Sequence, residues 1–461
     1  MMASLIAVCG AEAQKPDNTE LVPGPIETPW DAEAMVDVPF PEYPRMQLVR
    51  EEWQNLNGKW DWAITGKGAD MPGAWRGKIL VPFAFESQLS GVNRSISEED
   101  WMWYHRTFEV PADWAGKRTW LNFQASDWET VVYVNGREVG RHQEGYTPFA
   151  FDITDALNEA GTQDLVVRVW DHQGREHFVS SGKQTENKYY EPSSGIWQTV
   201  WLEPRAAGAI ESLVINASLG KKAVELTVAA DDYAEIRIEV LDGANVVAAG
   251  KGAPNRPLEI AIPDPKAWEP GNPFLYDLNI LLLKDGKAVD TVQSYFGLRD
   301  IRIDKSLDGP QIVLNGKAFF HFGPLDQGYW PLSTLTPPTD EALEFELKYI
   351  KSIGSNMVRL HGKRNPSRWY YYCDKYGLMV WQDFIFNRAD ESVQTAPGEL
   401  ERWKNEQQML MDSLNNHPSV VKWIVFNEEW GQHDTENTVE WARSLLPNHI
   451  VTAASGWNDV D

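Results

Sequence analysis

The chain has 461 residues, of which 43% are hydrophobic and 12% aromatic, and its formal net charge at pH 7 is −25. This length exceeds what one ordinary hydrophobic core accommodates, so we expect two to four globular domains. The acidic excess argues against a nucleic-acid partner, because such partners require surfaces rich in lysine and arginine. The 22 tryptophans include candidates for sugar stacking, although we expect most of them to fill cores.

Residues 1–13 resemble the second half of a secretory signal, with an apolar stretch followed by the A-x-A pattern "AEA". We therefore expect a leader and an exported protein, periplasmic or extracellular. A lipoprotein with Cys9 as the lipidated residue is the alternative. Without the leader, Cys373 is the remaining cysteine, so no disulfide framework is expected. No apolar run reaches the roughly 20 residues of a membrane span.

Residues 14–205 are predicted to form a β-sandwich of the jelly-roll type. The segment "TVVYVNGREVG" (130–140) alternates apolar and polar residues around Asn135-Gly136, a strong signal for a two-residue hairpin. Further strands are predicted at 164–170 and 197–204. Many short strands separated by Gly, Pro and Asn are typical of a sandwich or jelly roll.

Residues 206–302 are predicted to form a smaller, immunoglobulin-like sandwich. Strand patterns occur in "AVELTVAA", "EIRIEVL", "LEIAIP" and "LYDLNILLL", with polar turns between them. About one hundred residues with this pattern suit such a sandwich. The Cys-Trp-Cys core signature of antibody domains is missing, so the prediction depends on length and alternation.

From residue 303 to residue 461 strands and helices alternate, which favours a parallel sheet. The first helix has Thr339 as its expected N-cap and Gly354 as its expected C-cap. Five strands are predicted, at 318–322, 356–360, 378–381, 420–426 and 450–454, and four helices. Five strands do not close an eight-stranded barrel, so the pattern leaves a partial TIM barrel and an open doubly wound sheet as alternatives. No G-x-G-x-x-G motif supports nucleotide binding.

Polar and aromatic residues follow each of these strands, where a barrel places its functional side chains. The candidate site residues are Asp326 soon after strand one, Arg359 and His361 at the end of strand two, Trp381 and Asp383 at the end of strand three, Asn427 and Glu428 at the end of strand four, and Trp457 near the end of strand five. For three of these residues a purely structural role is the alternative to a role in the site. Asp383 could cap the next segment, Arg359 could form an ion pair, and Trp381 could pack in the barrel. His321 is expected to be a core or loop histidine.

Glu428 is the strongest chemical candidate because it directly follows an apolar strand. A carboxyl in a rim pocket lined by tryptophan would have its pKa raised by desolvation. Such a group suits a general acid that protonates a leaving-group oxygen near neutral pH. Glycoside hydrolysis requires this acid and a second carboxylate, about 5–5.5 Å away in retaining enzymes. Asn427 would then hydrogen-bond the sugar 2-hydroxyl.

The order of the three parts resembles glycoside hydrolase family 2, which includes β-galactosidases, β-glucuronidases and β-mannosidases. The motifs that carry the resemblance are "WYHRTFEVP", "SGIWQTVWLE", "FGLRDIRI", "SNMVRLHGK", "YGLMVWQDF" and "HPSVVKWIVFNE". The resemblance implies a retaining β-glycosidase with Glu428 as general acid/base, Asn427 as a substrate contact and Arg359 as a support for the catalytic carboxylates. By family frequency a β-galactoside is the favoured substrate.

Two departures from the family pattern stand out. The segment "HFGPLDQGYWP" (321–331) replaces the usual Asn-Arg-His-type motif, so the sugar pocket is altered. The family nucleophile follows strand seven, beyond the five strands predicted here, and Asp383 is not expected to replace it. The chain alone is therefore expected to be inactive, and a non-catalytic carbohydrate-binding protein or a decayed fragment is the alternative. The sequence shows no metal cage, although the resemblance allows Mg²⁺ or Na⁺ near the site; it does not indicate the oligomeric state.

Overall fold

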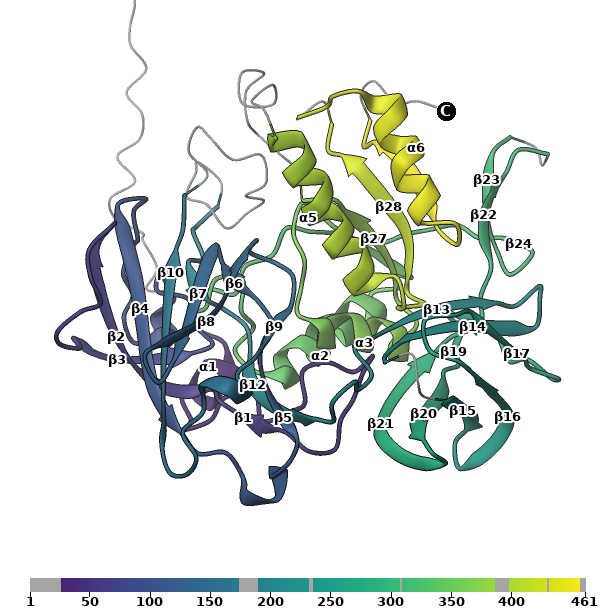
Figure 1. Cartoon of the computed structure of the whole chain (residues 1–461). Helices are drawn as coiled ribbons and strands as arrows, with labels where there is room; N and C mark the ends of the chain where they lie inside the picture. Colours follow the sequence, from purple (N-terminus) through teal and green to yellow (C-terminus); the bar gives the residue numbers. More distant parts are fainter. Residues whose placement is uncertain are drawn as a thin grey trace, which may run out of the picture.

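The computed structural model describes residues 26–173, 190–231, 235–306, 309–385, 398–428 and 431–456. In Figure 1 a large sandwich lies on the left and a smaller sandwich at the lower right, while the parallel sheet and its last two helices lie in the upper part and its first two helices lie lower, between the sandwiches. The predicted leader, Cys9 and Trp457 fall outside the described residues. No helix in the described ranges is both long and apolar enough to cross a membrane.

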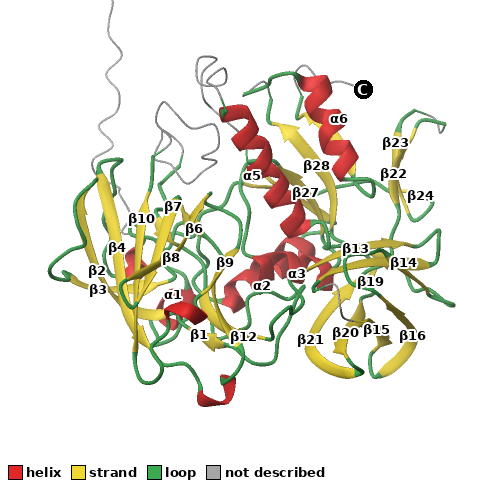
Figure 2. Cartoon of the chain, in the orientation of Figure 1, coloured by secondary structure: helices red, strands yellow, loops and turns green. Residues whose placement is uncertain are grey.

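The large sandwich consists of two antiparallel sheets, as the jelly-roll prediction requires (Figure 2). One sheet contains β1 (Gln54–Asn55), β12 (Val200–Arg205), β5 (Arg118–Phe123) and β9 (Phe149–Asp152). The other contains β3 (Gly77–Val81), β2 (Gly58–Gly66), β4 (Asp100–Phe108), β10 (Gln163–Trp170), β7 (Glu129–Val134) and β8 (Arg137–Gln143). β6 (Ser126–Asp127) and β11 (Gly195–Ile196) form a separate antiparallel pair. Trp60, Leu121, Val132 and Val200 belong to one buried core, which joins the inner faces.

The predicted hairpin at Asn135-Gly136 is confirmed. Asn135 has a φ of 51° and Gly136 a φ of 78°, so both residues occupy the left-handed region that a two-residue hairpin of type I′ requires. The turn joins β7 to β8. Preceding the sandwich, a short helix α1 (Pro29–Ala34) interrupts a region that the sequence indicated as entirely β.

The smaller sandwich has three strands in one sheet and four in the other. The strands are β13 (Ser212–Ser218), β14 (Ala223–Ala229) and β17 (Leu258–Ala261), facing β16 (Asn245–Gly252), β15 (Glu235–Asp242), β20 (Tyr276–Lys284) and β21 (Lys287–Phe296). Alternate residues such as Ile236, Ile238 and Val240 are fully buried, while their neighbours face outward. This alternation is the pattern that predicted an immunoglobulin-like sandwich. A short ribbon of β18 (Trp268–Glu269) and β19 (Asn272–Pro273) leads toward the next domain.

The third part is a parallel sheet with five strands and four helices within the described residues, as predicted. The strands are β25 (Leu325–Asp326), β26 (Met357–Leu360), β27 (Met379–Asp383), β28 (Val420–Phe426) and β29 (Ile450–Ala454), in that order. The helices are α2 (Asp340–Ser352), α3 (Ser367–Tyr376), α5 (Glu399–Leu414) and α6 (Thr435–Leu445). The spatial order follows the chain order without reversal, which is the order of a barrel and not of a doubly wound sheet.

The two faces of this sheet differ in chemistry. Val358, Val380 and Val425 pack with the helices in one buried cluster. Arg359, Trp381 and Lys422 lie on the opposite face, which corresponds to a barrel interior. The lower end of that interior is filled by an apolar cluster that includes Trp268 of the small sandwich together with Met357 and Met379.

The position of the first parallel strand was predicted wrongly. Residues 317–318 form β24 (Lys317–Ala318), which turns back on β23 (Gln311–Leu314), itself paired with β22 (Ile301–Asp304). The apolar run that suggested a strand is not buried, because Phe320 is 82% exposed and Phe322 58% exposed. The strand instead begins at Leu325, so His321 precedes it.

The helix signals after β25 are confirmed. The Thr339 hydroxyl accepts a hydrogen bond from the Ala342 backbone N–H at 3.2 Å, as an N-cap does. Gly354 follows the helix end with a φ of 88°, a conformation that glycine adopts without a steric penalty. Cys373 on α3 is buried and free.

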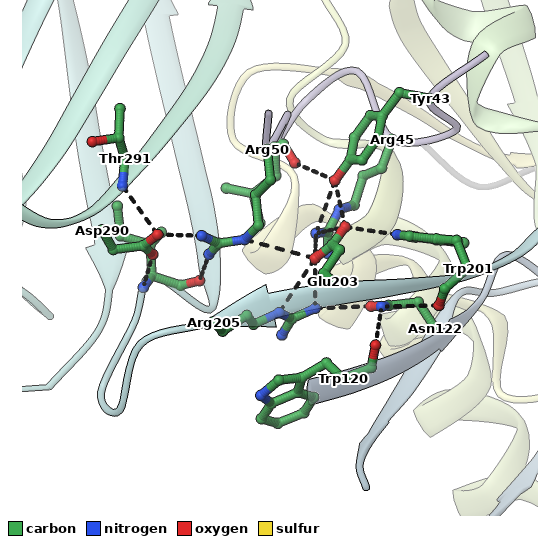
Figure 3. Close-up of polar contacts among 12 residues, drawn as sticks. Tyr43, Arg45, Arg50, Trp120, Asn122, Trp201, Glu203, Arg205, Asp290 and Thr291 are labelled. Carbon is green, nitrogen blue, oxygen red and sulfur yellow. Dashed lines mark hydrogen bonds and ion pairs between the residues drawn. The ribbon is translucent and has the colours of Figure 1, made fainter. Parts of the chain in front are cut away.

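A cluster around Glu203 of β12 joins the N-terminal segment to both sandwiches (Figure 3). The fully buried Glu203 carboxylate accepts hydrogen bonds from the side chains of Tyr43 at 2.5 Å, Arg45 at 3.0 and 3.1 Å, Trp201 at 2.7 Å and Arg205 at 3.2 and 3.3 Å. Arg50 lies 3.6 Å from the same carboxylate and also pairs with Asp290 of the small sandwich. Burial raises the pKa of Glu203, but Arg45 and Arg205 outweigh burial and bring it to about 2.

Candidate active site

A buried ion pair organises the carboxyl end of the sheet. Nε and one terminal nitrogen of Arg359 donate to the two carboxylate oxygens of Asp383 at 2.9 and 2.7 Å. The side chains are 18% and 1% exposed. The parallel register places Arg359 of β26 beside Trp381 of β27, which brings Asp383 to the height of the guanidinium. Of the alternatives left open by the sequence, the ion pair holds for Arg359, and Asp383 is its partner.

Arg359 also contacts the next strand. The same terminal nitrogen donates to Oδ1 of Asn427 at 2.9 Å, and the hydroxyl of Ser455 donates to this oxygen at 3.0 Å. Because Oδ1 accepts two hydrogen bonds, the amide orientation of Asn427 is fixed. Its Nδ2 is buried and has no hydrogen-bond partner among the described residues. A buried donor of this kind is available to a bound hydroxyl group.

Glu428 follows Asn427 in an uncommon backbone conformation. Its φ is 53°, in the left-handed region that side chains other than glycine rarely adopt. The Glu428 backbone N–H donates to the Ser455 hydroxyl at 2.9 Å, which fixes this conformation from the neighbouring strand end. Residues held in sparsely populated conformations occur preferentially at functional sites.

The residues that the structure describes do not enclose Glu428 in the tryptophan-lined pocket that was expected. The structure places Glu428 among the exposed residues. In the described part of the chain, β29 is the strand next to β28 and the last strand of the sheet. The expectation that Glu428 is buried in such a pocket does not hold among the described residues.

Trp381 and His321 form a second contact, deeper in the interior. Nε1 of Trp381 donates to Nδ1 of His321 at 2.9 Å, and the Lys422 ammonium lies 4.0 Å from the centre of the indole ring. Burial, assisted by Lys422, lowers the pKa of His321 to about 4, so the ring is neutral at pH 7. Trp381 lies within β27 and therefore contributes a wall of the interior.

Asp326 is held by groups from the neighbouring loop. Its carboxylate lies 3.0 Å from the Lys363 ammonium and accepts hydrogen bonds from the Gly328 N–H at 2.8 Å and the Asn365 amide at 3.1 Å. Burial raises its pKa, but Lys363 more than offsets burial, so the pKa lies below its usual range. The buried His361 donates its backbone N–H to the Asp326 carbonyl at 3.1 Å.

The structure thus brings together Arg359, Asp383, Asn427 and Glu428 at one rim, while Asp326 and His361 occupy its edge at β25 and β26. The sequence analysis did not identify Lys363, Lys422 or Ser455 as site residues. Ser455 could have been found from register, because β28 and β29 pair Phe426 with Ala454 and so align the residues that follow. Trp457 remains a prediction.

A metal role finds no support in the donor set. The described ranges contain no group of three or more His, Cys, Asp or Glu that could hold a metal ion.

Three consecutive segments match known domain families. Residues 53–204 match "Glycosyl hydrolases family 2, sugar binding domain", residues 196–299 match "Glycosyl hydrolases family 2", and residues 311–460 match "Glycosyl hydrolases family 2, TIM barrel domain". The chain belongs to glycosyl hydrolase family 2. Its third part is accordingly a TIM-barrel domain of this family, with a five-stranded parallel sheet present.

Curated proteins with two different named activities are similar to this chain. It is 27% identical over 443 residues to a β-glucuronidase of Bacteroides fragilis, covering 87% of this chain and 60% of that protein. It is 25% identical over 370 residues to a β-galactosidase of Thermoanaerobacter pseudethanolicus, covering 74% of this chain and 47% of that protein. The chain therefore spans about half the length of these curated relatives.

Solved structures support the fold. A β-D-glucuronidase of Dictyoglomus thermophilum superimposes with a TM-score of 0.71 at 23% identity, covering 89% of this chain and 73% of that one. A β-glucuronidase of Ruminococcus gnavus in complex with D-glucuronic acid gives a TM-score of 0.71 at 20% identity, covering 87% and 71%. At such identities the likeness concerns the fold alone.

Proposed function

We propose that this family 2 chain carries the acid/base half of a retaining β-glycosidase site, with Glu428 as general acid/base. The observation that carries the proposal is the arrangement of Asn427 and Glu428 at the end of β28, oriented by Arg359 and Ser455. A glycosidase requires a carboxyl group beside the scissile oxygen and a donor for the sugar hydroxyls. These two neighbouring residues offer both.

Glu428 donates its proton to the departing oxygen in the first step, and in the second it accepts a proton from water. Asn427 supplies its buried Nδ2, which has no partner in the described part of the chain, to the 2-hydroxyl of the sugar. This hydrogen bond strengthens as charge develops on the ring, so it favours the transition state over the ground state.

Arg359 and Asp383 are positioning residues in this proposal. The guanidinium holds Asn427 through its oxygen, and the Asp383 carboxylate fixes the guanidinium with two hydrogen bonds. Both Asp383 oxygens are engaged, which argues against Asp383 as the nucleophile. The family resemblance places the nucleophile after strand seven, so the 461-residue chain is proposed to have little or no turnover by itself.

The names of the relatives suggest two candidate glycones, galactose and glucuronic acid. Our sequence-based preference is a β-galactoside, whereas the relatives divide between β-galactosidases and β-glucuronidases, and the structural neighbours quoted above are β-glucuronidases. The test is hydrolysis of chromogenic β-galactosides, β-glucuronides and β-mannosides by a chain extended through the last barrel strand. Turnover of one glycoside supports the enzyme; sugar binding without any turnover supports the alternative, a non-catalytic carbohydrate-binding protein. The signal-like residues 1–13 support the further proposal of export, which fractionation of producing cells tests.

A further inference from the structure

A cavity lies close to the Asp326–Lys363 ion pair, at the edge of the candidate active site. It has a volume of about 300 Å³ and is enclosed by the segment before and within α1, the loop that follows β25, the helix α2, and the stretch after β26. None of the residues that line it is Arg359, Asp383, Asn427 or Glu428. This volume lies at the lower end of the range for small-molecule sites.

Aromatic side chains form the walls of the cavity. The Trp30 ring lies 6.3 Å from Trp330 in an edge-on arrangement and 4.9 Å from Phe345, centre to centre. Phe345 and Tyr349 occupy successive turns of α2, and their rings are 6.2 Å apart and inclined by only 17°. They remain 51% and 58% exposed, so together they present a flat apolar surface to solvent.

Polar groups lie among these aromatic side chains. The Lys363 ammonium is neutralised by Asp326 at 3.0 Å, and Asn365 and Glu346 complete the polar lining. Burial, together with the nearby Asp326, raises the pKa of Glu346 to about 8. Glu346 is therefore mainly a neutral carboxyl at pH 7, which both donates and accepts hydrogen bonds. The cavity combines apolar walls with uncharged or internally neutralised polar groups.

We propose that this cavity is a carbohydrate-binding subsite for a neutral pyranose ring, separate from the catalytic centre. The C–H face of a pyranose matches a flat aromatic surface, and its hydroxyls require donors and acceptors such as those of Glu346 and Asn365. A uronic acid is disfavoured because Lys363, the one cation among the described lining residues, is already paired with Asp326, so a uronate carboxylate would lack a counter-charge. A purely apolar ligand would leave the polar groups of the lining without partners.

Hydrogen bonds connect the loop that lines the subsite to the strand at the catalytic rim. The side-chain amide of Gln382 donates to the Lys363 carbonyl at 2.8 Å and to the Asp383 carbonyl at 2.7 Å. The loop that carries Lys363 is therefore fixed against the strand that carries Asp383. The choice of a carbohydrate as the ligand rests on the proposed function. An enzyme that degrades glycans binds substrates that contain several sugar units.

The test is titration of the 461-residue protein with neutral trisaccharides, namely cellotriose, xylotriose, mannotriose and galactotriose, followed by tryptophan fluorescence and saturation-transfer NMR. We expect at least one of them to bind with a Kd of about 0.1–1 mM. Phe345→Ala and Tyr349→Ala should each weaken binding about tenfold while the protein stays folded, because both side chains are already half exposed. Phe320→Ala is the matched control: this aromatic residue is 82% exposed outside the cavity, and its removal should leave the affinity unchanged.

Asn427→Ala separates this subsite from the candidate active site. Binding that persists in Asn427→Ala and falls in Phe345→Ala supports the subsite, whatever the outcome for catalysis. Binding that disappears in Asn427→Ala and is unaffected by Phe345→Ala places the sugar at the catalytic rim and overturns the subsite. Absence of binding by all four trisaccharides up to about 10 mM also overturns it, while leaving the hydrolysis test of the proposed function open.

Discussion

The guanidinium of Arg359 lies 2.9 Å from the amide oxygen of Asn427 and is itself held by Asp383. One arginine therefore links three neighbouring strands, β26, β27 and β28. Because the pair Arg359–Asp383 is nearly buried, it couples the orientation of the proposed substrate contact to the stability of the sheet.

Removal of one partner of this pair should destabilise the domain strongly. Arg359→Ala removes the guanidinium that makes two hydrogen bonds to the buried Asp383 carboxylate, and we expect the free energy of unfolding to fall by about 3–5 kcal/mol. Urea denaturation of the 461-residue chain at pH 7 measures this. Arg302→Ala is the control, since its pair with Asp304 has the arginine 56% exposed and should contribute less than about 1 kcal/mol. Equal losses for the two variants would show that the buried pair has no special structural role.

The Glu203 cluster should be a second point of sensitivity, because one carboxylate compensates several arginines between domains. Glu203→Gln keeps the shape but leaves excess buried positive charge at Arg45, Arg50 and Arg205, and we expect a loss of about 3 kcal/mol or more. Thermal unfolding at pH 7 is the measurement. Glu235→Gln, at a pair whose side chains are 49% and 55% exposed, should change stability by less than about 0.5 kcal/mol. A mild effect of Glu203→Gln would mean that the sandwiches are held together without this charge.

The stability of the large sandwich should decrease as pH rises from about 4.5 to 7. Glu86 accepts hydrogen bonds from the backbone N–H and hydroxyl of Ser194 at 2.9 and 2.7 Å, and burial raises its pKa to about 7, with Asp171 as a further cause. Between its unfolded pKa of 4.5 and this value the folded state binds the proton that the unfolded state has lost, so unfolding becomes easier as pH increases. The contribution of Glu86 amounts to at most about 3 kcal/mol.

Glu86→Gln removes this titration. Its free energy of unfolding should depend less on pH between 5 and 8 than that of the unchanged protein, with the gain largest at the upper end. Denaturant unfolding at several pH values checks the slope, and Glu109→Gln, at an exposed position, should leave it unaltered. A slope that Glu86→Gln does not change would assign the pH dependence to other buried acids such as Asp171.

Most of the fold could be predicted from local signals in the sequence. Asn135-Gly136 and Thr339 predicted a hairpin and a helix start because turn and cap geometry depend on a few adjacent residues. The strand predicted around Phe320 and Phe322 was wrong, because apolar residues are buried only where another element covers them. Lys317 and Ala318 instead pair with β23 in a hairpin. The spacing of apolar residues does not indicate which of these two pairings a segment adopts.

The candidate site was predictable to the extent that strand ends are predictable. Asn427 and Glu428 stand directly after β28, so their position at the rim followed from the strand alone. The contacts of Ser455 and Lys363 did not follow, because they depend on the lateral register of parallel strands and on loop conformation. The exposure of Glu428 also depends on neighbours that local patterns do not specify.

The most direct test of Glu428 as the acid/base is the leaving-group dependence of hydrolysis in a chain extended through the last barrel strand. In Glu428→Gln, kcat/KM for glycosides with poor leaving groups should fall by about 10²–10⁴, whereas activated aryl glycosides, which need little protonation, should lose far less. Glu440→Gln, an exposed glutamate on α6, is the matched control and should behave like the unchanged enzyme. A steep leaving-group dependence confined to Glu428→Gln is the result that this account predicts; equal and mild losses for all substrates would contradict it.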